Sequence, residues 1–239
     1  MSRVTFENYA TLSRAELPAT QIAGRYHVQA EAERRIVPDV VDKLAIAPDD
    51  ALLEIGCGVG ALIAPLSYLV RSAAGVDHPD VLAALRRRIG EGRVETLPGN
   101  FLDLEISGAY SKILVYSVLH CLSDGDEAMR FIQKAAGLLR PGGRLLLGDL
   151  PNSDRKARFQ ASPRGRAFEA EWAAARAADP DAPGPELQPD PDCFTPDDAF
   201  LLRILAWARG AGAHAYILPQ PPDLPFGHTR EDVVIEAPA

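Results

Sequence analysis

The chain has 239 residues, of which 47% are hydrophobic and 24% are charged, a composition typical of globular proteins that excludes wholesale disorder. Its formal net charge of -8 argues against a protein dedicated to binding nucleic acid or anionic membranes. No apolar run approaches the ~20 residues that cross a bilayer, and residues 1–21 lack the apolar core of a secretory signal. Three cysteines, Cys57, Cys121 and Cys193, have neither metal-ligand nor disulfide spacing, so we expect a cytoplasmic protein without a metal site.

Residues 1–29 are expected to form an amino-terminal arm, either a lid or a frayed end. Residues 30–44 have apolar side chains at helical spacing, and Pro38 either interrupts this helix or resets its start. The apolar run at 51–55 predicts a buried strand, and a second such segment closes at Asp77. Residues 81–89 again have helical spacing.

The same alternation continues with a strand at 112–117, a helix at 126–139, a turn at 140–143 and a strand at 144–148. Because strands and helices alternate in this order, the pattern predicts an α/β fold with a parallel sheet covered on both faces. Residues 30–150 are therefore expected to form the core domain.

Residues 151–196 differ in composition from the core. They contain a helical stretch at 164–178 and five prolines between 180 and 191, which is typical of a cap or an insertion. The next helix is predicted to have Thr195 as its N-cap and Pro196 at its first position, and to run to Arg209. Two strands, at 213–218 and 232–236, are predicted to pair antiparallel, so that residues 197–239 complete the sheet.

Three glycines at alternate positions, Gly56, Gly58 and Gly60, follow the strand at 51–55 and lead into a helix. Glycine permits a turn too tight for a Cβ and lets a ligand approach the backbone. Dinucleotide-binding folds use a related turn, so the glycines alone do not identify the ligand. Glu54, two positions before Gly56, favours a ligand with a cationic amino-acid end, because a carboxylate there would not help to bind a pyrophosphate.

Acidic residues follow two of the next strands. Asp77 could accept hydrogen bonds from both hydroxyls of a ribose. Asp103 could accept one from an adenine amine, with Phe101 or Leu102 beside the ring. Taken alone, each Asp could equally be a solvated turn residue. Residues 116–122 leave the fourth strand at the edge where ligands bind in open α/β sheets.

The sequence thus contains four elements: the glycine turn with Glu54, Asp77, the segment with Asp103, and residues 116–122. In this order and at these spacings, they resemble the class I S-adenosylmethionine-dependent methyltransferase family over residues 30–150. The resemblance implies an α/β, doubly wound, seven-stranded and mostly parallel sheet of the Rossmann-like type, with a reversed last strand and an inserted helical, Pro-rich cap. It also implies S-adenosyl-L-methionine as the cofactor and S-adenosyl-L-homocysteine as its product. Segments at 148–159, 218–221 and 224–226 are similar to methyltransferases from bacterial surface-glycan gene clusters.

By this resemblance, Glu54 and the three glycines hold the methionine part of the cofactor, Asp77 holds the ribose, Asp103 the adenine amine, and Tyr116 lines the sulfonium end. The complete set of expected cofactor-binding residues is Glu54, Gly56, Cys57, Gly58, Gly60, Asp77, His78, Asn100, Phe101, Leu102, Asp103, Tyr116 and Ser117.

Methyl transfer depends mainly on alignment of the reactants, and a general base is needed only for a hydroxyl or a protonated amine. His120 is the first candidate base because it follows the fourth strand at the ligand edge, although such a His is also often a structural hydrogen-bonding group or a pocket wall. His27 is the second candidate if the amino-terminal arm folds over the pocket; a solvated arm is the alternative.

Four residues are candidates for binding the methyl acceptor: Tyr26, Arg155, Arg158 and Trp172. Arg155 and Arg158 belong to a basic island in an acidic chain, which could bind a carboxylate or phosphate or form a solvated helical face. Trp172 could close a cap over the acceptor or serve only as a packing residue.

The sequence thus favours methyl transfer to a small molecule, such as a sugar or another metabolite with a hydroxyl, carboxyl or amine. No Asn-Pro-Pro-Tyr-like motif follows the fourth strand, which disfavours a nucleic-acid acceptor. Neither nucleic acid nor a membrane is therefore an expected partner of this acidic chain. A homodimer is a possible assembly. One alternative is an NAD- or nucleotide-dependent oxidoreductase, which the lack of a third suitably spaced glycine disfavours. The other is a non-catalytic methyltransferase-like subunit, which the presence of Glu54 and Asp77 disfavours.

Overall fold

A computed structural model describes residues 3–14, 22–23, 25–178 and 193–239, and at residues 3–6 and 27 the backbone alone. The strands are β1 (Ala51–Ile55), β2 (Ser72–Asp77), β3 (Glu95–Pro98), β4 (Tyr110–Tyr116), β5 (Leu139–Pro151), β6 (His214–Pro219) and β7 (Arg230–Glu236). The helices are α1 (Arg3–Ser13), η1 (His27–Gln29), α3 (Ala30–Glu33), α4 (Ile36–Leu44), α5 (Ile63–Leu66), α6 (Pro79–Ile89), η2 (Leu119–Cys121), α7 (Gly125–Ala136), α8 (Ser153–Ala161), α9 (Pro163–Ala178) and α10 (Asp198–Gly210). The predicted proline cluster at 180–191 lies outside the described residues.

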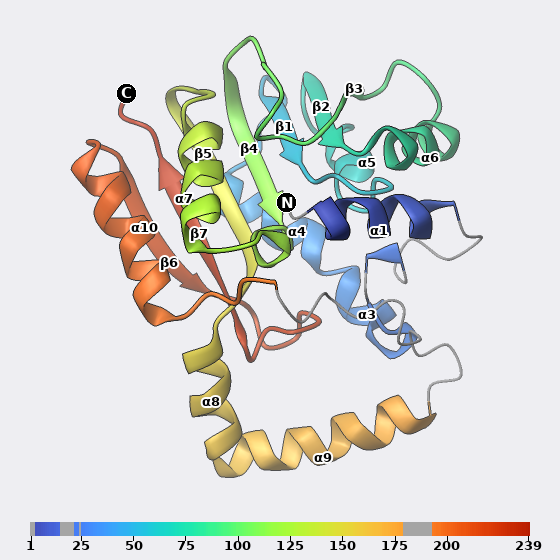
Figure 1. The fold of residues 1–239 in the computed structure, drawn as a ribbon, viewed down its shortest axis with the longest axis vertical. Helices are drawn as coiled ribbons and strands as arrows, with labels where there is room; N and C mark the ends of the chain where they lie inside the picture. Colours follow the sequence, from blue (N-terminus) through green and yellow to red (C-terminus); the bar gives the residue numbers. More distant parts are fainter. Residues whose placement is uncertain (1–2, 15–21, 24, 179–192) are drawn as a thin grey trace.

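The strands form one seven-stranded sheet with the order β3-β2-β1-β4-β5-β7-β6 (Figure 1). Strands β1 to β5 pair in parallel, whereas β7 lies antiparallel to both of its neighbours, β5 and β6. Short apolar strands alternate with helices in the sequence, and parallel neighbours require such crossover connections. The predicted mostly parallel sheet with its reversed last strand is therefore confirmed.

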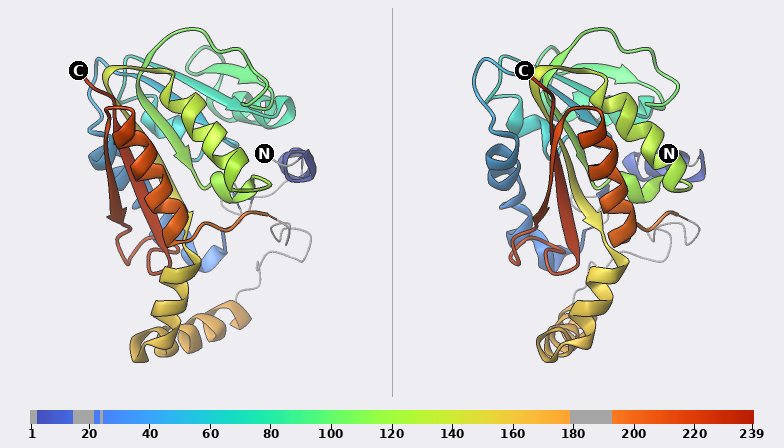
Figure 2. Two further views of the ribbon diagram at one scale, coloured as in Figure 1. Left: turned by 60° about the vertical axis from the view of Figure 1, so that its left-hand side comes forward. Right: turned by 90° about the vertical axis from the view of Figure 1, so that its left-hand side faces the viewer.

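Helices cover both faces of the sheet (Figure 2). On one face, Val40 and Leu44 of α4 pack in one hydrophobic cluster with side chains from α5, α6 and the sheet. On the other face, Phe131 of α7 and Ile204 of α10 pack against Ile113 of β4 and its neighbours. Because the central strands are buried on both sides, they are apolar at nearly every position. The doubly wound architecture follows from this pattern.

The parallel strands bring their carboxyl ends to one edge of the sheet, where α1, residues 22–23 and residues 25–29 also lie (Figure 1). Helices α8 and α9 continue from the end of β5 and extend beyond this edge. The chain segments that follow β1, β2, β4 and β5 are therefore gathered in one region, and this is the region in which ligands bind in open α/β sheets.

The predicted start of the helix after the cap is wrong. Thr195 and Pro196 precede α10, and its N-cap is Asp197, whose Oδ1 accepts a hydrogen bond from the N–H of Phe200 at 2.8 Å. A carboxylate at this position satisfies a free N–H and also interacts favourably with the helix dipole. The predicted helix at 30–44 forms as two helices, α3 and α4, and Pro38 lies in the first turn of α4, where its missing N–H costs nothing.

Helix α8 was not predicted from the sequence, and the helix before β5 was predicted to end in a separate turn. The N-cap of α8 is Asn152, whose side chain accepts hydrogen bonds from the N–H groups of Asp154 and Arg155. This helix has no buried residue, so it carries no apolar periodicity that would reveal it. The turn predicted at 140–143 belongs to the irregular first part of β5, which runs from Leu139 to Pro151.

Candidate functional site

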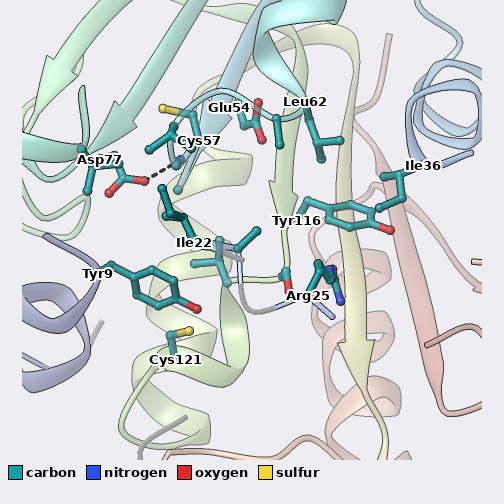
Figure 3. A pocket seen from close by; sticks show the side chains of 18 of the residues that line it. Tyr9, Ile22, Arg25, Ile36, Glu54, Cys57, Leu62, Asp77, Tyr116 and Cys121 are labelled. Atoms are coloured by element: carbon teal, nitrogen blue, oxygen red, sulfur yellow. Dashed lines mark hydrogen bonds between the residues drawn. The ribbon is translucent and has the colours of Figure 1, made fainter. Parts of the chain in front are cut away.

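A cavity of about 120 Å³, the edge cavity, lies at the carboxyl ends of β1, β2 and β4 (Figure 3). Seven of the predicted cofactor-binding residues line it: Glu54, Gly56, Cys57, Gly58, Asp77, Tyr116 and Ser117. They come from three strands and the turns that follow them, which are far apart in the sequence. The parallel sheet therefore brings together the residues that the motifs suggested.

Glu54 lies near the end of β1 with only 3% of its surface exposed. Its carboxylate accepts a hydrogen bond from the backbone N–H of Ile63, but Oε2 has no hydrogen-bond partner among the described residues. Burial, together with the nearby Asp77, raises the pKa of Glu54 well above its usual value. A buried carboxylate without a partner is costly, so the position is suited to a ligand that brings a cation or a hydrogen-bond donor.

Asp77, at the end of β2, holds the glycine turn in place. Its Oδ2 accepts a hydrogen bond from the N–H of Gly58 at 2.8 Å, and its Oδ1 accepts one from the N–H of His78 at 2.7 Å. Burial raises the pKa of Asp77, while these two hydrogen bonds act in the opposite direction. Because each carboxylate oxygen has two lone pairs, Asp77 can still accept hydrogen bonds from a ligand.

The glycines of the turn serve different purposes. Gly58 has a φ of +54°, and a Cβ at this position would meet no atom within 4 Å, so the turn presents bare backbone to open space. A Cβ at Gly60 would instead stand 2.3 Å from Cδ1 of Leu85, and Gly60 does not line the edge cavity. Gly58 is thus the glycine that leaves room for a ligand, whereas Gly60 permits close packing of α6.

A second, smaller cavity of about 20 Å³ continues from the first and shares Gly56, Asp77 and Val118 with it. Asn100 and Phe101 line this smaller cavity, and Phe101 is also packed against Phe131 of α7. Three other predicted cofactor residues line neither cavity. His78 caps α6, Leu102 packs against the core and Asp103 is exposed.

The predicted cofactor site did not include the amino-terminal residues that close the edge cavity, although the arm with Tyr9 was expected to be either a lid or a frayed end. Tyr9 of α1, Ile22 and Arg25 line it opposite the glycine turn (Figure 3). Burial raises the pKa of Tyr9 above its usual value, so its hydroxyl stays protonated. Apolar and aromatic residues in a polar arm were a usable signal, but the sequence did not indicate onto which surface the arm would fold.

Arg25 also takes part in a buried ionic network that the sequence did not reveal. It donates a hydrogen bond to Asp149 Oδ2 at 2.7 Å, and Ser117 Oγ donates to the same oxygen at 2.8 Å. Arg230 lies 3.7 Å from Asp149 Oδ1. Burial alone would raise the pKa of Asp149, but Arg25 and Arg230 lower it to about 2. The carboxylate is therefore ionised and held between two guanidinium groups.

A larger cavity of about 650 Å³, the cap cavity, lies between α8, α9 and the loop at 224–230. His120 lines this cavity, whereas its neighbours Val118 and Cys121 line the edge cavity. Nδ1 of His120 is buried without a hydrogen-bond partner among the described residues. Burial and, to a smaller extent, Arg230 lower the pKa of His120 to about 3. The imidazole is therefore neutral at physiological pH.

Only some of the candidate acceptor-binding residues lie at a cavity. Trp172 of α9 lines the cap cavity, and Tyr26 packs edge-on against it with ring centroids 5.4 Å apart. Arg155 and Arg158 line neither cavity, because Arg155 pairs with Glu231 of β7 and Arg158 pairs with Asp198 of α10. The side chain of His27 lies outside the described part of the structure.

Two further classes of site do not occur in the described ranges of the chain. No group of three His, Cys, Asp or Glu side chains there could hold a metal ion. No helix in the same ranges is long and apolar enough to cross a membrane.

Parts of this chain are similar to known proteins. Residues 53–147 match a family model described as a methyltransferase domain. The methyltransferase GfsG of Streptomyces halstedii is 28% identical over 132 residues, which cover 51% of this chain and 45% of that protein. The chain spans less than half of the length of the sequence relatives that it matches.

Solved structures share the fold. The N-methyltransferase NodS of Bradyrhizobium japonicum in complex with S-adenosyl-L-homocysteine superposes with a TM-score of 0.63 at 14% identity, covering 98% of this chain and 99% of that one. Magnesium protoporphyrin IX methyltransferase of Synechocystis, also with bound S-adenosyl-L-homocysteine, gives a TM-score of 0.59 at 14% identity and covers 99% and 95% of the two chains. In its matching domain, its sheet order and the carboxylate and glycine turn of its edge cavity, the chain is similar to the class I S-adenosylmethionine-dependent methyltransferases.

Proposed function

We propose that this protein binds S-adenosyl-L-methionine in the edge cavity and transfers its methyl group to a small-molecule acceptor. The observation that carries the proposal is the carboxylate of Glu54, which is buried and has no partner for Oε2 among the described residues. It lies in the same cavity as the open face of Gly58 and the carboxylate of Asp77. These groups match the cationic, backbone-contacting and hydroxyl-bearing parts of that cofactor.

In this proposal each part of the cofactor has its own residues. Glu54 binds the ammonium of the methionine end, and Gly58 lets this end approach the backbone. Asp77 accepts hydrogen bonds from the ribose hydroxyls with the lone pairs that the turn does not use. The adenine would lie toward Asn100 and Phe101, where the smaller cavity of about 20 Å³ would have to widen to take the ring, and Asp103 stays a candidate partner for its amine.

The bound cofactor supplies a methyl group that its sulfonium has already activated. The task of the protein is then to orient the two reactants and to exclude water, which gives most of the rate enhancement in such transfers. Tyr116 and Ser117 at the end of β4 form the floor of the edge cavity, and Tyr9 and Ile22 cover it from the amino-terminal side. We infer that this amino-terminal arm acts as a lid over the cofactor.

His120 is proposed to orient the acceptor and not to act as a general base that holds a proton at neutral pH. Burial keeps its imidazole neutral, with a pKa of about 3, so it would not retain a proton taken from the acceptor. Its buried Nδ1 can instead exchange a hydrogen bond with the acceptor and so orient it. His27 is a second candidate for such contacts if the arm closes over the bound acceptor.

The acceptor is proposed to be a small molecule, and the protein is proposed to act in the cytoplasm without nucleic acid. An acidic chain with a net charge of -8 supports this choice over a polyanionic partner. The homodimer stays a prediction, which light scattering of the purified protein would test.

Calorimetry with S-adenosyl-L-methionine and, separately, with NAD tests the proposed cofactor. We expect the first to bind and the second not to bind. Glu54→Ala should weaken binding by more than tenfold, whereas Asp49→Ala, an exposed carboxylate before β1, should leave it unchanged. Binding of NAD alone would overturn the proposal. Transfer of a labelled methyl group from the cofactor to a metabolite extract then distinguishes an enzyme from a non-catalytic subunit.

A further inference from the structure

We propose that the cap cavity is the acceptor site and that it binds an aromatic carboxylic acid that carries a hydroxyl or an amine. This inference rests on the proposed function, because the cap cavity becomes an acceptor site only if the edge cavity holds the methyl donor. It names a class of ligand that follows from the size, the ring surfaces and the charge of the cap cavity.

The size and the surface of the cap cavity suit a flat apolar body. Its volume of about 650 Å³ lies within the usual range for sites that bind small molecules. Four aromatic side chains from three segments line it: Phe168 and Trp172 of α9, Phe194 and Phe226. Aromatic walls favour ring-shaped ligands, because stacked or edge-to-face contacts add to the burial of apolar area.

The charged groups of the cap cavity are all of one sign. Lys156 and Arg230 line it, and no Asp or Glu occurs among its described lining residues. The exposed Lys156 forms no ion pair with any side chain that the structure describes, whereas Arg230 is already close to Asp149. Lys156 is therefore the group available to a ligand carboxylate, and the cavity disfavours a cationic acceptor.

The periodicity of α8 explains why Lys156 faces the cavity and the two neighbouring arginines do not. Ser153, Lys156, Ala157 and Gln160 lie on one side of the helix, at spacings of three or four residues, and all of them line the cap cavity. Arg155 and Arg158 lie on the other side. There they hold α8 to β7 and α10 through Glu231 and Asp198.

His120 provides the polar contact at the inner end of the cap cavity. It lines the cavity with a buried Nδ1 that has no hydrogen-bond partner within the described ranges. A buried polar atom without a partner suggests a missing ligand or water. A hydroxyl or amine of the acceptor can form this hydrogen bond, since the neutral imidazole can accept or donate there.

The two cavities share a wall, so a group held at His120 lies next to the edge cavity. Ser117 and Arg25 line the edge cavity, Arg230 lines the cap cavity, and all three bind the carboxylate of Asp149. Within the segment that follows β4, His120 and Cys121 are adjacent but face different cavities. Methyl transfer requires direct contact between the acceptor atom and the methyl group, so the reacting end of the acceptor would have to pass this wall beside His120 to reach the edge cavity.

The test uses three probes in calorimetry with the full chain in the presence of S-adenosyl-L-homocysteine. 3-Hydroxy-2-naphthoate has both features of the proposed ligand, 2-naphthol lacks the carboxylate, and cyclohexanecarboxylate lacks the aromatic ring. We expect naphthoate to bind at least tenfold more tightly than either of the other two. High salt should weaken its binding and leave that of naphthol unchanged.

Two variants of α8 make the test specific. Lys156→Gln should reduce the affinity for naphthoate about tenfold, to nearly that of naphthol, because it removes the available cation. Arg158→Gln, two residues away on the other side of the helix, should leave the affinity unchanged. His120→Gln should weaken both aromatic probes, because each has a hydroxyl.

Several results would overturn the inference: equal affinity for naphthoate and naphthol, no effect of Lys156→Gln, or tightest binding of cyclohexanecarboxylate. Failure of this inference is separable from failure of the proposed function. If the cofactor binds but naphthoate does not, only the acceptor class is wrong. If naphthoate binds with the expected effects of the variants but the cofactor does not bind, the cavity is a ligand site and the proposed methyl transfer is wrong.

Discussion

Asp149, near the end of β5, forms a buried ion pair with Arg25 of the amino-terminal segment, with Nη2 and Oδ2 2.7 Å apart. The two side chains are only 2% and 5% exposed. Asp149 has a φ of +57° and its partner Ser117 a φ of +61°, a region that non-glycine residues rarely adopt. The strained backbone at the ends of β4 and β5 thus presents the groups that hold the amino-terminal arm against the site.

Arg25→Met should destabilise the protein by about 3 kcal/mol, because it removes one of two cations from a buried carboxylate. The free energy of unfolding from urea denaturation measures this effect. Arg34→Met, which removes an exposed pair with Glu31, should cost less than about 0.5 kcal/mol and is the matched control. Equal costs for the two variants would mean that Arg25 does not anchor the arm.

Glu54→Gln should abolish a proton release that accompanies cofactor binding. Burial and the nearby Asp77 raise the pKa of Glu54 in the free protein, and the ammonium of the cofactor would lower it again. Between the two pKa values binding releases a proton, so the affinity should rise as the pH rises. Calorimetry in buffers with different ionisation enthalpies measures the released protons. A wild type without any release would contradict the assignment of Glu54.

Gly58→Val and Gly60→Ala should fail for different reasons. A side chain at Gly58 would extend into open space, so this variant should lose cofactor binding, with only the strain of its φ of +54° acting on stability. A Cβ at Gly60 would stand 2.3 Å from Leu85 Cδ1, so this variant should lose stability first. Thermal unfolding and calorimetry on both variants separate the effects. Full binding by folded Gly58→Val would exclude the turn as the cofactor platform.

Asp77→Ala should weaken binding of S-adenosyl-L-methionine by about 2–3 kcal/mol, since it removes the charged acceptor proposed for the ribose hydroxyls. It also removes the acceptor for the N–H of Gly58, so Asp77→Asn, which retains an oxygen, helps to separate the two roles. Circular dichroism should show that the fold is retained. Unchanged affinity in calorimetry would disprove the assignment.

His120 should make the protein less stable in mild acid. Its pKa is about 3 in the folded protein and about 6.5 in the unfolded chain, so only the unfolded chain takes up a proton as the pH falls below 6.5. Its contribution to stability is complete above pH 6.5 and falls by about 1.4 kcal/mol per pH unit down to about pH 3. Between pH 7 and pH 5, the wild type should lose about 2 kcal/mol more than His120→Gln in urea denaturation. His214→Gln, which removes an exposed imidazole, should behave like the wild type.

The sequence indicated the sheet and most of the edge cavity because both depend on local patterns. Apolar runs that alternate with helical spacing predicted the parallel sheet, and the position of each motif after a strand predicted that Glu54, Gly58, Asp77 and Tyr116 would share one edge. It did not predict α8, whose exposed side chains carry no periodic signal, and it assigned Thr195 as the cap of α10 instead of Asp197.

The sequence by itself determined the resemblance to methyltransferases, the architecture of the core and the residues that follow each strand, since these are features of contiguous segments. Only the tertiary structure decided how distant segments meet: Arg25 with Asp149, Tyr26 with Trp172, and His120 with the cap cavity. It also decided that Lys156 faces the cap cavity, whereas Arg158 pairs with Asp198. Local sequence does not encode such choices, because a charged side chain on a helix is satisfied equally well by solvent or by any opposite charge that the folded chain brings within reach.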